Sequence, residues 1–163
     1  MTFQKTFIIN NKSNTENKIY SLTGLSSNYE FNLESTKSSK LCTEEEGGEL
    51  ITCKQVNSWW SSEIEITLPN PINQNIIHFS KQSNAKSFKV QGSLKQNVEV
   101  DWRWKFDSET TSYELIDREH RVLADIVDFT LKKKCRGKLR ITDSLSDDVE
   151  HLILTSACLI WSI

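Results

Sequence analysis

The C-terminal segment 146–163 constrains the fold most, because its apolar residues surround every side of the helix that it predicts. Either Ser144 or Ser146 can cap its start, and the first turn is acidic, with Asp147, Asp148 and Glu150. A surface helix has one apolar stripe, whereas a helix that is apolar on every side is buried on every side. The segment therefore predicts a helix enclosed by the rest of the chain.

Two other interpretations of this segment fit the sequence less well. A membrane anchor needs about 20 apolar residues, and the uninterrupted part, 152–163, is shorter and contains Thr155 and Ser156. A helix packed on one face of a sheet would expose Leu154, Cys158 or Trp161 to water. An enclosed helix fits the pattern better than either.

The chain before this helix has the period-2 alternation of short β-strands. In 98–106 every second residue is Val, Trp or Phe, and charged residues alternate with them. We expect about twelve strands, at 3–10, 18–23, 29–33, 40–43, 49–55, 63–68, 75–79, 86–91, 98–106, 112–117, 122–129 and 134–141. Together with the helix they predict a mainly β protein in one domain, 1–163. The expected fold is a closed, roughly twelve-stranded antiparallel barrel around the buried C-terminal helix.

Composition limits the classes of partner. The chain has 163 residues, of which 37% are hydrophobic and 26% charged, as in a soluble globular domain. Its net charge of −2 gives no general attraction to nucleic acid or to anionic membranes, so such a partner would need a local patch. The N-terminal residues lack the apolar core of a signal peptide, and we therefore expect an intracellular, cytoplasmic protein.

A family resemblance rests on several short stretches. They are SFKV at 87–90, WRWK at 102–105, YELID at 113–117, VLA at 122–124 and RGKLRI at 136–141, followed by the apolar helix. The chain resembles an uncharacterised fungal family of the tubby-like and phospholipid-scramblase-like superfamily. The resemblance implies a twelve-stranded barrel around a central C-terminal helix. That superfamily includes phosphoinositide binders, but no binding residue can be carried over position by position.

A basic run is the main candidate site. Its members are Lys132, Lys133, Lys134, Arg136, Lys138 and Arg140. On a strand the last four would point the same way, about 6.6 Å apart, as a cationic ridge on the outside of the barrel. Each cation near an anionic membrane surface contributes about 1 kcal/mol of attraction. The alternative is a solvated face, balanced by acidic residues of adjacent strands or protecting an edge.

Trp59 and Trp60 form a second candidate, for contact with a partner. Adjacent residues on a strand face opposite ways, so at most one of the two can enter the core. The other covers a neighbour, is exposed, or anchors a partner.

No motif predicts a metal, a cofactor or catalysis. The cysteines Cys42, Cys53, Cys135 and Cys158 lack metal-ligand spacing, and the histidines His78, His120 and His151 are far apart in the sequence. The acidic run 44–46 lacks the ligand spacing of a calcium loop. We therefore expect no metal site, no cofactor and no catalytic residue.

These observations favour a non-enzymatic binding domain without a transmembrane segment or a nucleic-acid partner. We expect it to bind an anionic lipid or phosphoinositide headgroup through the basic strand and to lie at the periphery of a membrane. One alternative is a protein-interaction module that uses Trp59 or Trp60 and the proline-containing loop 69–71. Another is an enzyme whose site is dispersed through the sequence.

Overall fold

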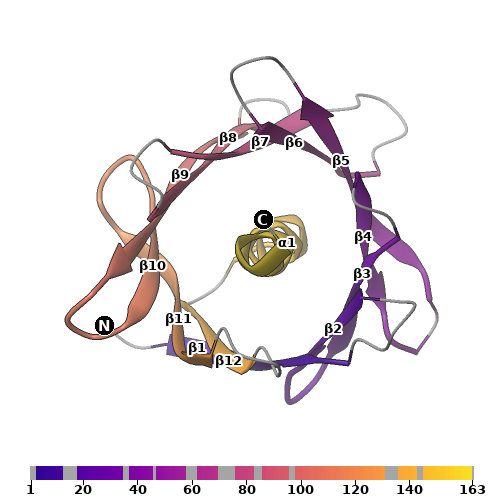
Figure 1. Cartoon of the computed structure of the whole chain (residues 1–163), viewed down its shortest axis with the longest axis horizontal. Coiled ribbons are helices and arrows are strands. Elements are labelled where there is room, and N and C mark those ends of the chain that lie inside the picture. The colour runs from indigo at the N-terminus through magenta and orange to yellow at the C-terminus, as the bar shows by residue number, and fades with distance from the viewer. Residues whose placement is uncertain are drawn as a thin grey trace.

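The molecule is a closed antiparallel β-barrel with one helix along its centre (Figure 1). The computed structural model describes residues 3–12, 18–34, 37–45, 47–57, 62–69, 76–82, 86–95, 98–130, 136–142 and 145–162. Within these ranges the backbone alone is described at 57, 62, 95, 129, 130, 136, 161 and 162.

Each strand pairs with its neighbour in the sequence, and β1 pairs with β12 to close the barrel. The strands are β1 Phe3–Asn11, β2 Lys18–Thr23, β3 Asn28–Leu33, β4 Ser38–Thr43, β5 Glu49–Asn57, β6 Ser62–Thr67, β7 Ile76–Lys81, β8 Ser87–Lys95, β9 Val98–Asp107, β10 Ser112–Ile116, β11 Val122–Thr130 and β12 Arg136–Thr142. Closure pairs the backbone groups that an open sheet would leave at its two edges. The expected twelve-stranded barrel is confirmed.

The period-2 pattern decides which side chains face inward. In β9, Val100, Trp102 and Trp104 are buried, whereas Arg103 and Lys105 between and after them are exposed. Successive side chains of a strand point to opposite faces of a sheet, so one alternating sequence supplies both a dry inner face and a wet outer one.

The helix α1 (Asp147–Ser162) fills the space inside the strands (Figure 1). It begins where the Glu150 N–H donates to the Ser146 carbonyl at 2.9 Å, and its first turn is acidic. Every residue from 152 to 160 is buried, including the polar Thr155 and Ser156. The helix is therefore enclosed, as its all-round apolar sequence predicts.

Polar contacts fix the helix against the wall at two levels. In the core, Trp104 Nε1 donates to Ser156 Oγ at 2.9 Å, and Ser156 Oγ donates to the Ile153 carbonyl at 3.1 Å. At the start of the helix, Lys5 Nζ lies 2.7 Å from Glu150 Oε1, and the Glu150 side chain is only 5% exposed. Directional bonds of this kind, unlike apolar packing, select one rotation and one depth of the helix.

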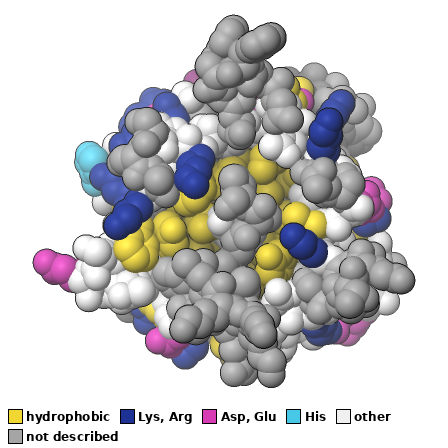
Figure 2. All heavy atoms as spheres, in the orientation of Figure 1, with side chains coloured by type: hydrophobic (Ala, Val, Ile, Leu, Met, Phe, Trp, Pro, Cys, Tyr) yellow, Lys and Arg dark blue, Asp and Glu magenta, His cyan; other side chains and the backbone are white. Residues whose placement is uncertain are grey.

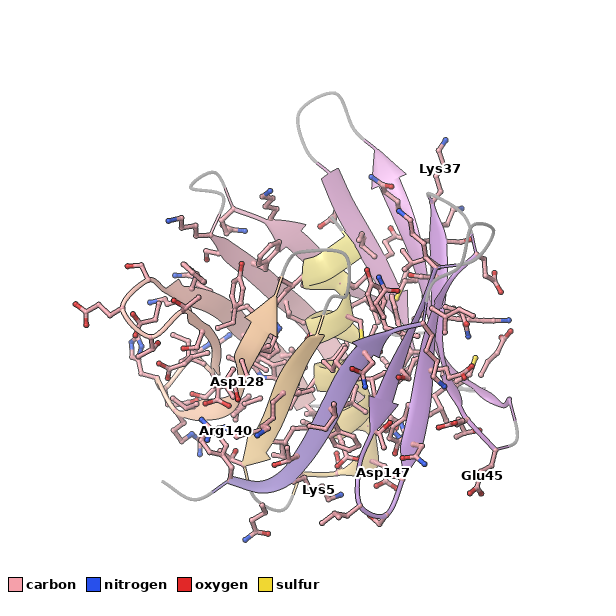
Figure 3. All side chains as sticks on the ribbon, turned by 60° about the horizontal axis from the view of Figure 1, so that its bottom comes forward. Lys5, Lys37, Glu45, Asp128, Arg140 and Asp147 are labelled. Atoms are coloured by element: carbon pink, nitrogen blue, oxygen red, sulfur yellow. The ribbon has the colours of Figure 1, made fainter. Side chains whose placement is uncertain are left out.

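The direction of α1 distinguishes the two ends of the barrel. Asp147, Lys5 and Glu45 lie toward one end in Figure 3, and Lys37 lies toward the other. We call the end where α1 finishes the C-terminal mouth. The strand ends that flank residues 12–17, 34–37, 58–61, 82–86, 108–111 and 131–135 belong to this mouth.

The Trp104–Ser156 hydrogen bond can be tested by mutation. Ser156→Ala should lower the free energy of unfolding by about 1–3 kcal/mol, because it leaves a buried indole N–H without an acceptor. Adding Trp104→Phe to Ser156→Ala should cost less than the two single changes together, as urea denaturation would show. Thr155→Val is the control, since the Thr155 hydroxyl donates only to the helix carbonyl of His151. Strictly additive effects of the Trp104 and Ser156 changes would contradict the contact.

The environment of His151 predicts a dependence of stability on pH. Its ring meets Tyr29 edge-on at 5.4 Å, and burial lowers its pKa below the ordinary 6.5, against the opposing effect of Glu150. The unfolded chain therefore binds the proton first as pH falls, so stability should decline from about pH 6.5 downward until the folded histidine is also protonated.

Urea denaturation between pH 7.5 and 5.5 measures this slope. His151→Gln should reduce it, because the variant has no imidazole at this position to protonate. His120→Asn is the control, since it removes an exposed imidazole and places at that positive φ of 62° a residue that tolerates it. An unchanged slope in His151→Gln would show that other groups cause the pH dependence.

Candidate functional site

The predicted basic ridge lies partly on β12. There Gly137, Leu139 and Ile141 are buried, and Lys138 and Arg140 lie between them on the outer face. Lys132, Lys133 and Lys134 lie outside the described residues, and only the backbone of Arg136 is described, opposite Asn10 and Thr130.

Arg140 is held by a carboxylate of the neighbouring strand. It lies directly opposite Asp125 in β11, and its Nε donates to Asp125 Oδ1 at 2.8 Å while Nη2 donates to Oδ2. Its guanidinium also lies 4.4 Å from the ring centroid of Phe3. The hydrogen bonds to Asp125 raise the pKa of Arg140 further. Arg140 therefore has a structural partner for its charge and its planar donor groups.

Lys138 has a weaker partner. Its Nζ lies 3.8 Å from Asp128 Oδ2, and both side chains are solvent-exposed, at 42% and 77%. Figure 3 shows Asp128 near Arg140 on the adjacent strand. The two cations of β12 whose side chains are described thus face acidic residues of β11, which is the arrangement of a balanced solvated face.

Four lysines gather at the C-terminal mouth, and the sequence gives no local signal of them. Each lysine is exposed and lies two positions along the chain from a buried residue. Because residues two apart on a strand share a face, these lysines lie on the inner side of the wall, just beyond the core. The lysines and their neighbours are Lys18 (Tyr20), Lys37 (Ser39), Lys81 (Phe79) and Lys86 (Phe88).

Apolar side chains lie inside this ring of lysines. Leu33, Ile64, Phe106 and Tyr113 are only partly buried at the strand ends of the mouth. Figure 2 shows apolar surface at the centre of this face, with Lys and Arg side chains around it. Lysines and apolar side chains of the mouth are neighbours at two places. Lys18 lies opposite Leu33 in the pairing of β2 with β3. Lys86 Nζ lies 5.4 Å from the Phe106 ring centroid.

The carboxylates nearest this end are engaged elsewhere or lie in a turn. Glu34 lies 2.7 Å from Lys40 and Glu63 lies 3.2 Å from His78, both on the outer wall. Asp107 accepts the Glu109 N–H at 2.9 Å within the turn that follows β9. In the described part of the chain, Lys18, Lys81 and Lys86 form no ion pair.

The opposite end is acidic and its arginines are neutralised. A hollow of about 240 Å³ is lined there by Glu99, Asp101, Trp102, Asp117, Arg118, Glu119 and Arg121. Arg118 lies 3.3 Å from Asp101, and Arg121 lies 2.8 Å from Asp117, which also accepts two backbone N–H groups of its own turn. These contacts shape the turn between β10 and β11, and they pair both arginines that line the hollow with carboxylates.

Two cysteines of the described chain are buried and unreactive. Burial raises the pKa of the Cys53 thiol to about 12 and that of Cys158 still higher, so both remain protonated and unreactive. Among the described residues no three His, Cys, Asp or Glu side chains are placed to hold a metal ion. Trp59, Trp60 and Cys135 lie outside those residues.

Comparison with protein-family models, curated proteins and solved structures found no match to this chain. Among the residues that the structure describes, no helix is long and apolar enough to cross a membrane. The lysines and apolar side chains of the C-terminal mouth are the described surface feature that most favours a binding function.

Proposed function

We propose that this chain is a non-enzymatic, cytoplasmic binding domain whose C-terminal mouth docks on an anionic membrane surface. One observation carries the proposal: four exposed lysines, Lys18, Lys37, Lys81 and Lys86, lie with partly buried apolar side chains at one end of the barrel. Figure 2 shows Lys and Arg side chains beside apolar surface on this face. Lipid phosphates would meet the ammonium groups, and the apolar centre would meet the interface beneath them. The lysine stems suit this position, because they cover apolar surface while the charge stays in water.

The expected attraction is modest and depends on salt. Each lysine near an anionic surface contributes about 1 kcal/mol, and the effect extends over about one Debye length. That length falls from about 30 Å at 0.01 M salt to about 8 Å at 0.15 M. Because the whole chain has a net charge of −2, attraction must come from this local group.

The mouth replaces β12 as the main proposed contact. Lys138 and Arg140 face Asp128 and Asp125, so their charges are already balanced. The strand ends that flank 131–135 belong to the mouth, and we extend the proposal to Lys132, Lys133 and Lys134 from their place in the sequence.

The lysines can also stabilise the end of the helix, and that role must be separated from docking. The C-terminal carbonyls of α1 carry a partial negative charge at this end, and the last turn of the helix has no basic residue. Lysines that only offset this charge would stabilise the fold. Their replacement would then lower stability, whereas docking predicts lost binding with stability little changed.

A protein partner is the second candidate. Val56, near the end of β5, is 37% exposed on the outer face, close to the sequence segment that contains Trp59 and Trp60. The C-terminal mouth could also meet such a partner, because an acidic protein surface with an apolar centre would complement its lysines and apolar side chains.

Vesicle flotation tests membrane docking. The wild-type protein should float with phosphatidylserine-containing vesicles at 0.01 M salt and largely dissociate at 0.15 M. Lys18→Glu with Lys81→Glu should weaken binding at least tenfold, since two attractions of about 1 kcal/mol become repulsions. Lys54→Glu with Lys138→Glu is the matched control, with the same charge change on the outer wall.

The other outcomes also decide between proposals. If the outer-wall variant loses binding and the mouth variant keeps it, the contact follows β12 instead. If the wild-type protein does not float at low salt, membrane docking is wrong and the protein-partner proposal takes its place. Urea denaturation of both variants separates a change in binding from a change in stability.

A further inference from the structure

Two cations face each other on the outer wall of the barrel. Lys89 in β8 lies directly opposite Arg103 in β9, and both alternate with buried residues, so both point outward. Side chains paired in this way have Cβ atoms about 5 Å apart, and like charges at that position destabilise a sheet.

Three other cations of the outer wall lie opposite a carboxylate instead of a cation. Opposite Lys54 is Glu65, opposite Lys105 is Glu114, and opposite Arg140 is Asp125. The nearest carboxylate along β9 is Asp101, and Arg118 lies 3.3 Å from it. Within the described ranges, neither Lys89 nor Arg103 forms an ion pair.

Two donors lie beside the pair on the outer face, and the carboxylates Asp101 and Glu114 lie one position further, next to Arg118 and Lys105. Ser80 lies opposite Lys89 on β7, and its Oγ accepts a hydrogen bond from Gln82 Nε2 at 3.3 Å, which leaves the Ser80 O–H as a donor. Lys105 follows Arg103 on the same face of β9, about 6.6 Å further along the strand. Three adjacent strands thus present hydrogen-bond donors at one place on a rigid wall.

We propose that Lys89 and Arg103 bind a phosphate monoester group, with Ser80 and Lys105 beside it. A carboxylate would neutralise one cation and leave the other unpaired. A monoester carries about −1.5 to −2 charges at pH 7 and three strong acceptor oxygens, so one group can satisfy both cations. The guanidinium of Arg103 fits two of these oxygens, and the ammonium of Lys89 reaches the third as a point charge.

This site is separate from the proposed membrane contact. Its two cations lie on the outer face of β8 and β9, whereas the lysines of the mouth continue the inward-facing side of the strands. The phosphate group can belong to a soluble molecule or to a lipid headgroup, and the experiment distinguishes the two sources.

Titration of the ¹⁵N-labelled full chain with glycerol 3-phosphate, followed by NMR, tests the site. Saturable shifts should appear in β8 and β9 amides around Lys89 and Arg103. Dimethyl phosphate, a monoanionic diester, should bind at least tenfold more weakly at the same ionic strength. Lys89→Gln and Arg103→Gln should each weaken glycerol 3-phosphate binding at least tenfold, whereas Lys54→Gln should not.

Thermal unfolding without ligand gives an independent readout. Lys89→Gln and Arg103→Gln should raise the midpoint or leave it unchanged, because each removes repulsion between like charges. A merely structural role for these residues would lower it. Non-saturable shifts, equal binding by the variants, or a lower midpoint in both variants would overturn the proposal.

Vesicles then identify the source of the phosphate. The double variant Lys18→Glu with Lys81→Glu is mixed with vesicles that contain either phosphatidic acid or phosphatidylglycerol. If it floats only with phosphatidic acid, the phosphate site binds a lipid headgroup. Glycerol 3-phosphate binding without such flotation supports it as a site for a soluble phosphate. If the wild-type protein floats with vesicles but does not bind glycerol 3-phosphate, the proposed phosphate site is wrong and the membrane proposal is unaffected.

Discussion

The structure depends on filling the inside of a closed twelve-stranded barrel. A barrel of about eight strands is just wide enough for its own side chains to fill, whereas a wider one encloses extra space. Here α1 occupies that space, so the inner faces of the strands and the surface of the helix form one core. The Trp104–Ser156 and Lys5–Glu150 contacts fix the helix within it. Neither the wall nor the helix has another way to bury its apolar surface.

This arrangement directs function to the outside of the molecule. Because α1 fills the centre, a ligand has to bind at the surface, where Lys54, Lys105 and Arg140 each lie opposite a carboxylate of the neighbouring strand. Two groups of cations depart from that balance. The lysines of the C-terminal mouth surround an apolar centre, and Lys89 faces Arg103. Among the described residues, cations without an ion pair, Lys18, Lys81 and Lys86 at the mouth and Lys89 and Arg103 on the wall, are the physical basis of the two proposals.

The fold was predictable because its signals are local. The alternation in β9 and the all-round apolar helix can both be read from neighbouring residues, and they predicted a closed barrel around a buried helix. The resemblance to the tubby-like and phospholipid-scramblase-like superfamily implied the same architecture, and membership of that superfamily remains a prediction. The site was less predictable, because it depends on register and closure. Asp125 meets Arg140 only through the pairing of β11 with β12, and the mouth lysines come from separate strands.

Native-state hydrogen exchange tests the central claim most directly, since it measures the free energy at which each amide is exposed. If α1 and the wall form one core, the amides of residues 152–159 should exchange only through global unfolding. They should share the exchange free energy and urea dependence of the central amides of β8 and β9. Exchange of the helix through a smaller opening, while the strands stay protected, would contradict the account. The barrel would then be stable without its helix.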